Sequence, residues 1–158
     1  MFIRIKKVKG KEYAYLVENE WKSGSKQKVK GYIGRVYRPE LSSQIGFLNF
    51  YNLSAEEILK KDVKEIFNDL LKWEIHKHSI TEFEINAGSF AVMKSKKNCA
   101  VLINDGFLCS YTLKNLFGFR PIEHESDTMR LARCLVEAGI KVPQEIFVGL
   151  CEKMFKFE

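Results

Sequence analysis

Apolar and polar residues alternate over much of residues 2–37, and this period of two is typical of half-buried β-strands. Gly, Ser and Lys residues interrupt the alternation at residues 9–11 and 22–26, where we expect turns. Pro39 ends the pattern. The sequence therefore predicts a three-stranded antiparallel meander with basic side chains on its turns and its solvent face.

Within this meander the tyrosines and glycines occupy particular positions. Tyr13 and Tyr15 share one face of the second strand, and Ala14 lies on the other. Gly31 and Gly34 lie inside the third strand. A glycine weakens a strand unless a β-bulge or the close approach of another backbone requires it. We therefore expect either a weakened third strand or one of these two features.

The hydrophobic period lengthens to about 3.6 residues after residue 54, as in an amphipathic helix. Ser54 and Glu57 form a capping box of the serine-x-x-glutamate kind, which marks a helix start. The apolar residues that follow at three- and four-residue spacing are Ile58, Leu59, Val63, Ile66, Phe67, Leu70, Leu71 and Trp73. This pattern predicts one long helix from about 55 to 76.

Shorter patterns fill the rest of the chain. Strands are expected at 83–85, 89–93 and 99–103, a short helix at 112–117, and two helices at about 127–138 and 143–156. The expected fold class is α+β: a basic three-stranded antiparallel meander, a long amphipathic helix, a second small antiparallel sheet and a C-terminal helical pair. We expect residues 1–40 to form the meander module and residues 41–158 an α+β body, packed together as one compact unit.

Positive charge is concentrated in the meander. The chain of 158 residues has a formal net charge of +6. Residues 1–40 carry eleven Lys and Arg against four Glu, whereas the rest of the chain is close to neutral. Such asymmetry favours a polyanionic partner, nucleic acid above all. A lysine-rich surface that serves only solubility is the alternative.

The candidate nucleic-acid-binding residues are the cations and aromatic side chains of the meander. They are Arg4, Lys6, Lys7, Lys9, Lys11, Tyr13, Tyr15, Trp21, Lys22, Lys26, Lys28, Lys30, Tyr32, Arg35 and Arg38. Lys and Arg neutralise phosphates, and Tyr and Trp stack on bases. The alternative is that the aromatic side chains pack across strands and the lysines are only solvated.

Two runs of the meander resemble a known module. They are IRIKKVKGKEYAYLVE from Ile3 to Glu18 and KVKGYIGR from Lys28 to Arg35. Together, over residues 3–38, they resemble the N-terminal β-strand segment of insertion-sequence DDE transposases and the start of small uncharacterised archaeal proteins. The resemblance implies nucleic-acid binding. It does not extend to the transposase reaction, which needs three metal-binding carboxylates on an RNase H-like domain larger than residues 39–158 can form.

We therefore expect a non-catalytic nucleic-acid-binding protein. RNA, ribosomal or transfer RNA, is slightly favoured over DNA, because no dimerisation element or groove-reading helix is evident. Three alternatives remain: a protein–protein adaptor whose basic sheet binds an acidic partner, a transposon-derived DNA-binding module, and a hydrolase or nuclease using carboxylates such as Asp105 and Asp127. The C-terminal helical pair is nearly neutral, which favours core packing or a protein-docking surface over a helix-turn-helix.

No cofactor or metal site is predicted. Glu74, His76 and His78 offer ligand atoms, but on a helix the two histidines point about 200° apart and cannot share a metal. Cys109 and His124 could form a thiol–imidazole pair, yet nothing local activates the thiol. The four cysteines have apolar neighbours and no metal-ligand spacing, which is typical of buried free thiols in a reducing compartment.

The chain also lacks the patterns of a membrane or secreted protein. No apolar run approaches the roughly 18 residues needed to cross a bilayer. Charged residues interrupt the apolar stretch at the N-terminus, so no secretory signal is predicted. We expect a cytoplasmic location and no membrane partner.

Overall fold

The computed structural model describes residues 1–21 and 24–155. The strands are β1 (Phe2–Val8), β2 (Lys11–Trp21), β3 (Ser25–Tyr37), β4 (Glu84–Asn86), β5 (Ala91–Lys94), β6 (Lys97–Ile103) and β7 (Gly106–Leu108). The helices are α1 (Phe47–Tyr51), α2 (Ala55–Leu59), α3 (Val63–Lys77), α4 (Ser110–Phe117), α5 (Glu125–Glu137) and α6 (Gln144–Met154). The fold class is α+β, as predicted.

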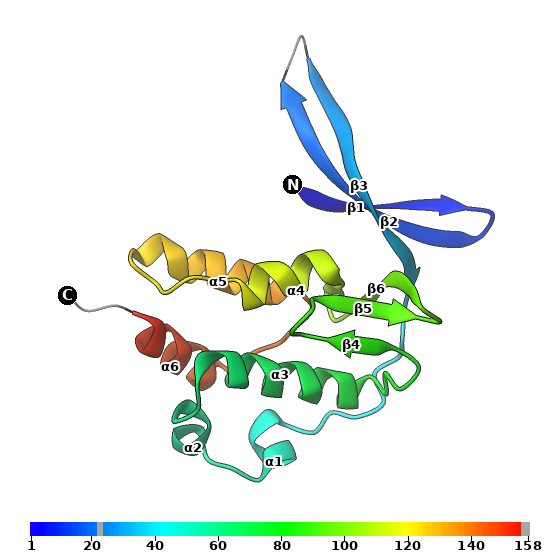
Figure 1. Ribbon diagram of the computed structural model, residues 1–158. Coiled ribbons are helices and arrows are strands. Elements are labelled where there is room, and N and C mark those ends of the chain that lie inside the picture. The colour runs from blue at the N-terminus through cyan, green and yellow to red at the C-terminus, as the bar shows by residue number, and fades with distance from the viewer. Residues whose placement is uncertain (22–23, 156–158) are drawn as a thin grey trace.

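All strands belong to one mixed sheet with the order β1-β2-β3-β6-β5-β4, and β7 pairs with β6 (Figure 1). The three N-terminal strands form the predicted antiparallel meander. The predicted second antiparallel unit is present as β4, β5 and β6, but it is not a separate sheet, because β3 and β6 pair in parallel at Arg35–Tyr37 and Cys99–Val101. The meander and the body therefore share a continuous sheet.

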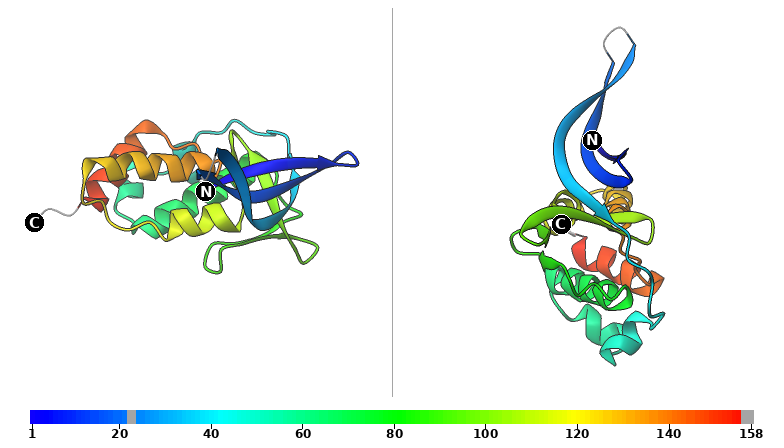
Figure 2. Two further views of the ribbon diagram at one scale, coloured as in Figure 1. Left: turned by 90° about the horizontal axis from the view of Figure 1, so that it is seen from above. Right: turned by 90° about the vertical axis from the view of Figure 1, so that its right-hand side faces the viewer.

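The N-terminal strands also project from the body. Figure 1 shows the far part of the β2–β3 hairpin rising away from the helices, and the right-hand view of Figure 2 shows the same from another side. We call this part the ribbon: residues 18–21 of β2 and 25–29 of β3, beyond the reach of β1, which begins at Phe2 opposite Val17. Two-stranded hairpins are only marginally stable in water by themselves. The ribbon is thus the segment of the sheet with the least support from the core.

Two β-bulges interrupt the pairing of β2 with β3, and the glycines of β3 lie beside them. The register shifts between Ala14 and Tyr15 and again between Leu16 and Val17. Gly34 has a φ of +148°, and a Cβ there would lie 2.1 Å from the carbonyl oxygen of Asn98. Both features that could justify glycine in this strand are therefore present, the bulge and the close backbone approach.

The predicted single helix over residues 55–76 is wrong, because it is divided into α2 and α3. The capping box of Ser54 and Glu57 does begin α2. Asp62 then has an extended backbone at the start of α3, and Lys61 Nζ donates to Asp69 Oδ2 at 2.8 Å, which ties the break to α3. The apolar spacing hides the break, since both helices bury their apolar residues in the same core.

The core has two parts. The larger one joins the helices to the inner strands, and Ile66, Leu70, Leu113 and Ile146 are fully buried within it. The smaller one lies beneath the meander and contains Ala14, Ile33, Val36, Ala100 and Cys109. Burial of these residues fixes which face of the meander turns toward the body.

The predicted C-terminal helical pair is present as α5 and α6. Gly139 follows α5 with a φ of +78°, the left-handed conformation that glycine adopts readily after a helix. Its position is also crowded, because a Cβ would lie 2.5 Å from a side-chain carbon of Ile103. Within the part of the chain that the structure describes, none of the helices has the length and hydropathy required to cross a membrane.

Candidate nucleic-acid interface

The register of the meander sorts its side chains onto two faces of different chemistry. Residues that pair directly share a face, and successive residues alternate between faces. Lys6 pairs with Tyr13, Arg4 with Tyr15, Tyr15 with Tyr32, and Tyr13 with Arg35. We call the surface made by Arg4, Lys6, Lys11, Tyr13, Tyr15, Tyr32 and Arg35 the tyrosine face. It lies opposite the smaller core, on the side away from Ala14.

The glutamates of the meander lie on the other face, where they form ion pairs. Lys28 Nζ is 3.5 Å from Glu20 Oε1, Lys30 Nζ is 3.2 Å from Glu18 Oε2, and Arg38 binds Glu12 through two hydrogen bonds of 2.7 and 2.8 Å. We call this surface the ion-pair face: Glu12, Glu18, Glu20, Lys26, Lys28, Lys30 and Arg38. The Arg38 hydrogen bonds lower the pKa of the Glu12 carboxyl below its ordinary value.

This sorting separates the candidate residues into two groups. Among the described residues of β1, β2 and β3, the tyrosine face carries cations and no carboxylate. Lys26, Lys28, Lys30 and Arg38 were predicted to contact phosphate, but each lies on the face that holds the glutamates. A lysine already paired to a carboxylate gains less from a phosphate, so the tyrosine face is the better candidate.

The tyrosine face is built around three contacting rings. The centroid of Tyr32 lies 5.1 Å from that of Tyr15 and 6.4 Å from that of Tyr13. Lys6 Nζ lies 4.9 Å from the centroid of Tyr15, a cation–π distance. Burial raises the pKa of Tyr32, and the neighbouring Tyr15 hydroxyl adds to the effect. Part of the predicted aromatic function is therefore packing within the sheet.

Exposure differs widely among the aromatic residues. Tyr13 and Tyr15 are half-buried, and the rings of Tyr15 and Tyr37 each have a cation placed over them. Tyr32 is 59% exposed and Trp21, at the end of the ribbon, is 79% exposed. These two rings are the ones best placed to stack on a base.

The ribbon continues the tyrosine face with uncharged side chains. Asn19 pairs with Gln27, and both share the face of Tyr15 and Val17. Gln27 accepts a hydrogen bond from Arg4, which links the ribbon to the cations of β1. Side-chain amides donate and accept hydrogen bonds at base edges. Neither residue was predicted, because charge and aromaticity do not distinguish these amides from other polar side chains.

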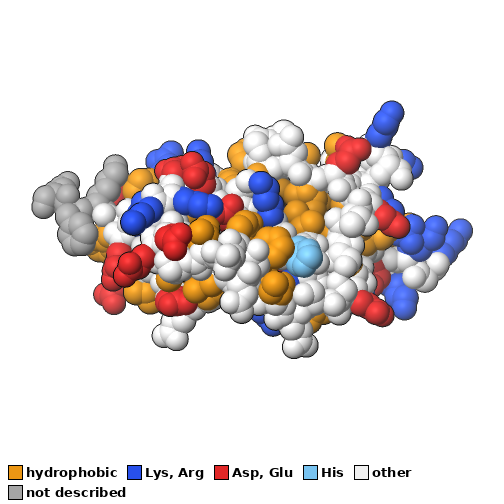
Figure 3. All heavy atoms as spheres, turned by 90° about the horizontal axis from the view of Figure 1, so that it is seen from below, with side chains coloured by type: hydrophobic (Ala, Val, Ile, Leu, Met, Phe, Trp, Pro, Cys, Tyr) orange, Lys and Arg blue, Asp and Glu red, His pale blue; other side chains and the backbone are white. Residues whose placement is uncertain are grey.

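The remaining candidates lie at the edges or outside the described residues. Lys7 pairs in register with Glu12, on the face turned toward the body. Lys9 occupies the β1–β2 turn with a φ of 50°. In Figure 3, basic side chains gather at the right-hand end, where the β1–β2 hairpin lies in Figure 1. Lys22 lies outside the residues that the structure describes.

The residues considered for metal binding or catalysis lie apart from one another or are packed against other parts of the fold. His76 lies against the ring of Phe50, with centroids 4.8 Å apart, whereas His78 is buried and faces Glu74. Cys109 is fully buried, and burial raises its pKa, whereas His124 is exposed at the start of α5. Within residues 1–21 and 24–155, no group of three or more potential ligands could hold a metal ion.

The two carboxylates proposed for a nuclease are also apart. Asp105 lies in the β6–β7 turn and lines cavities beside α5 and β1. Asp127 lies in a different cavity and accepts hydrogen bonds from the backbone N–H groups of Glu123 and His124. These hydrogen bonds lower the pKa of Asp127. They also form part of the cap at the start of α5, so Asp127 has a structural role there. The geometry gives this pair no shared site.

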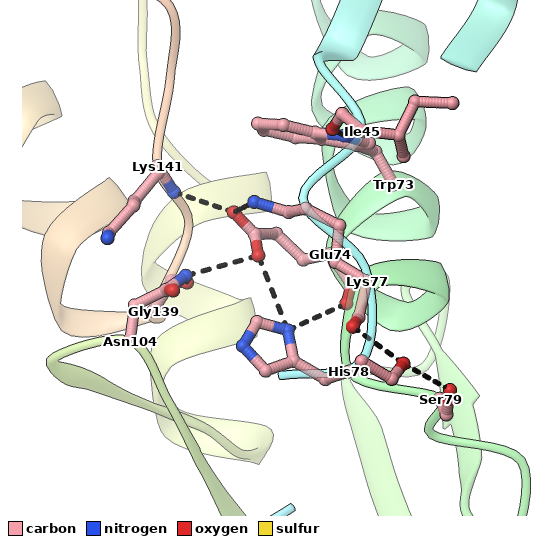
Figure 4. A network of polar contacts seen from close by, with 10 residues as sticks. Ile45, Trp73, Glu74, Lys77, His78, Ser79, Asn104, Gly139 and Lys141 are labelled. Carbon is pink, nitrogen blue, oxygen red and sulfur yellow. Dashed lines mark hydrogen bonds and ion pairs between the residues drawn. The ribbon is translucent and has the colours of Figure 1, made fainter. Parts of the chain in front are cut away.

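A buried ionic network, shown in Figure 4, was not predicted. Glu74 is fully buried, and its Oε1 accepts from Lys77 Nζ at 3.2 Å and from the backbone N of Lys141 at 3.0 Å. Its Oε2 accepts from Asn104 Nδ2 at 3.1 Å and lies 3.6 Å from His78 Nδ1. The network ties α3 to the β6–β7 turn and to the α5–α6 joint. Lys77 and His78 lie three and four residues after Glu74, but Asn104 and Lys141 come from segments far apart in sequence, so no local pattern indicated the complete network.

One cavity of about 510 Å³ lies beside this network, between α5, α6 and the β6–β7 turn. Leu135, Ile140 and Phe147 contribute apolar surface, and Asn104 and Lys141 contribute polar groups. The volume lies within the range of small-ligand sites. The predicted docking of a protein partner at the C-terminal helices stays a prediction.

Comparison of the chain with known proteins gives no match to a family model, a curated protein or a solved structure. The resemblance of residues 3–38 to a transposase segment therefore rests on the residues quoted for it and stays a prediction.

Proposed function

We propose that this protein is a non-catalytic nucleic-acid-binding protein that binds RNA through the tyrosine face. The observation that carries the proposal is the separation of charge across the meander. Arg4, Lys6 and Arg35 share a face with three tyrosine rings, and the glutamates lie on the other side.

The chemistry of this face suits a polyanion with exposed bases. Arg4, Lys6 and Arg35 supply the phosphate contacts, and their counterions are released on binding. The aromatic rings supply sequence-tolerant stacking. The described residues of the tyrosine face include no carboxylate, so phosphates avoid the repulsion that they would meet on the ion-pair face. An acidic protein could use the same cations and bury the exposed rings, and the experiment below separates this alternative from RNA.

The test compares two variants with equal loss of charge. Arg4→Gln/Lys6→Gln/Arg35→Gln removes three cations from the tyrosine face. Lys26→Gln/Lys28→Gln/Lys30→Gln removes three from the opposite side. All six side chains are exposed, so both variants are expected to fold. Binding to labelled single-stranded RNA, structured RNA and duplex DNA is measured by fluorescence anisotropy between about 50 and 200 mM salt.

The wild type is expected to bind RNA with a strong salt dependence. The tyrosine-face variant should lose most of this affinity, and its slope of log K against log salt should fall by about 2, which corresponds to about 0.7 per lost phosphate contact on a single strand. The ion-pair-face variant should keep most of the RNA affinity and most of the salt dependence. Salt-insensitive binding, or equal losses in the two variants, would contradict the proposal. Binding to no nucleic acid would favour the acidic protein partner, and a preference for duplex DNA the transposon-derived module.

A further inference from the structure

We infer that the ligand of the tyrosine face is an unpaired RNA strand that lies along the ribbon, with bases stacked on Tyr32 and on Trp21. The inference rests on the proposed function and adds to it the structural class of the RNA and its path. It uses the described residues only.

The exposed rings select an unpaired strand. In a duplex the bases are stacked on one another, and the outer surface offers phosphates, sugars and base edges. A ring such as Tyr32, 59% exposed on a sheet surface, would have no base face to contact there. In a single strand the bases turn outward and stack on aromatic side chains. Stacking of unpaired bases on Tyr32 and Trp21 would remove their exposed ring surface from water.

The cations and uncharged residues divide the path into two parts. Arg4, Lys6 and Arg35 surround the tyrosine rings at the supported end of the meander. Beyond them, the same face of the ribbon offers the Asn19–Gln27 pair and no charge. Phosphates are therefore held at the supported end, and base edges meet amide groups along the ribbon.

The distance between the two rings sets the length of strand required. Tyr32 pairs with Tyr15, and Trp21 lies six residues further along β2. At about 3.3 Å per residue, the two positions are roughly 20 Å apart. A strand of a few nucleotides can reach one ring, and a longer strand can reach both. Affinity should therefore rise with length until Trp21 is reached.

Tryptophan fluorescence provides a direct test, because the chain has two tryptophans in opposite environments. Trp73 is 6% exposed, and its Nε1 donates to the carbonyl oxygen of Ile45, so it should not respond to ligand. Trp21 is exposed and should be quenched when a base stacks on it. Oligouridylates of increasing length and a blunt RNA duplex are titrated into the wild type, Trp21→Phe, Trp21→Ala, Tyr32→Ala and Met129→Ala. Met129 is an exposed apolar residue on α5 and serves as the matched control.

The expected result is quenching of the wild type by long oligouridylate, reduced quenching by the shortest, and little quenching of Trp21→Phe. Trp21→Ala and Tyr32→Ala should each weaken binding of the long strand by roughly 5- to 150-fold. Met129→Ala should bind as the wild type does, and the duplex should bind more weakly than the single strand.

Two failures are distinguishable. If no RNA binds, the proposed function itself is wrong. If RNA binds in a manner that depends on Arg4, Lys6 and Arg35, but the duplex is preferred or Trp21 is neither quenched nor required, the inference is overturned and the proposed function stands.

Discussion

Replacing Glu74 by alanine is expected to lower the free energy of unfolding by about 3–5 kcal/mol, because it leaves a buried ammonium group without its counter-ion. Lys77 Nζ lies 3.2 Å from Glu74 Oε1, and the two side chains are 8% and 0% exposed. The carboxylate also accepts from Lys141 N and Asn104 Nδ2. Both of these hydrogen bonds are part-buried, and Asn104 Nδ2 keeps the carbonyl oxygen of Gly139 as an acceptor, so the unpaired ammonium group is expected to account for most of the loss.

Two further variants show whether the cost comes from the unpaired charge. In Lys77→Met the Glu74 carboxylate keeps its other donors, so the loss should be smaller than in Glu74→Ala. In the double variant Glu74→Leu/Lys77→Met no charge of the pair remains, and apolar side chains of similar size fill the space. Such replacements are often close to neutral. The double variant should therefore be more stable than Glu74→Ala.

Urea unfolding followed by circular dichroism measures these differences, provided that the slope of free energy against urea concentration is unchanged. Glu20→Ala supplies the surface comparison. Its Lys28 pair is 3.5 Å long, with side chains 40% and 57% exposed, and should cost less than about 1 kcal/mol. A loss below about 1 kcal/mol for Glu74→Ala would refute the argument. So would a double variant that is no more stable than the single one.

Three further predictions concern other parts of the fold. Gly34→Ala should destabilise the protein by at least about 1–3 kcal/mol in urea unfolding, because of its positive φ and the crowded Cβ position, whereas Gly31→Ala, with nothing within 4 Å, should change stability by less than about 1 kcal/mol. Burial raises the pKa of Cys99 to about 11, so mass spectrometry should find its thiol unmodified by iodoacetamide at pH 8 in the native protein and modified after unfolding. Backbone hydrogen bonds lower the pKa of Asp127, so their contribution to stability is present above the unfolded pKa of about 3.9 and lost as the pH falls through the folded value. Asp127→Asn should therefore have a lower Tm than the wild type at pH 7, and the difference should vanish in strong acid.

The local features of the fold were predictable because they repeat within a few residues. The alternation in residues 2–37 specifies the meander, and the Ser54–Glu57 capping box specifies the start of α2. The parallel pairing of β3 with β6 was not predictable, because it joins segments more than 60 residues apart and leaves no periodic signal. The break between α2 and α3 could not be predicted, because the apolar residues of the two helices keep the spacing of a single helix across it.

The residue types of the candidate site followed from the charge of the first 40 residues, but their division between two faces did not. Strict alternation places Tyr32 on the same face as Lys28 and Lys30. The two bulges in β3 each add one residue, so Val29, Tyr32 and Arg35 come to lie on one face. A one-residue shift moves every later side chain to the other face. Which side chains share the tyrosine face therefore depends on the two bulges. In the sequence, only Gly31 and Gly34 indicate where these bulges lie.

Under the proposed function, this dependence on the bulges means that the net charge of the meander overstates the number of cations available to phosphate. Lysines on the ion-pair face lie across from glutamates, and such cross-strand pairs stabilise a two-stranded ribbon that has little core beneath it. Charged side chains on the ribbon also oppose edge-to-edge association with other strands. Under the proposed function, the cations that share a face with Tyr32 are therefore the ones available to the ligand. The two triple variants remove equal charge from the two faces, but only the tyrosine-face variant is expected to lose RNA affinity. An account based on net charge alone predicts equal losses, so the comparison separates the two accounts.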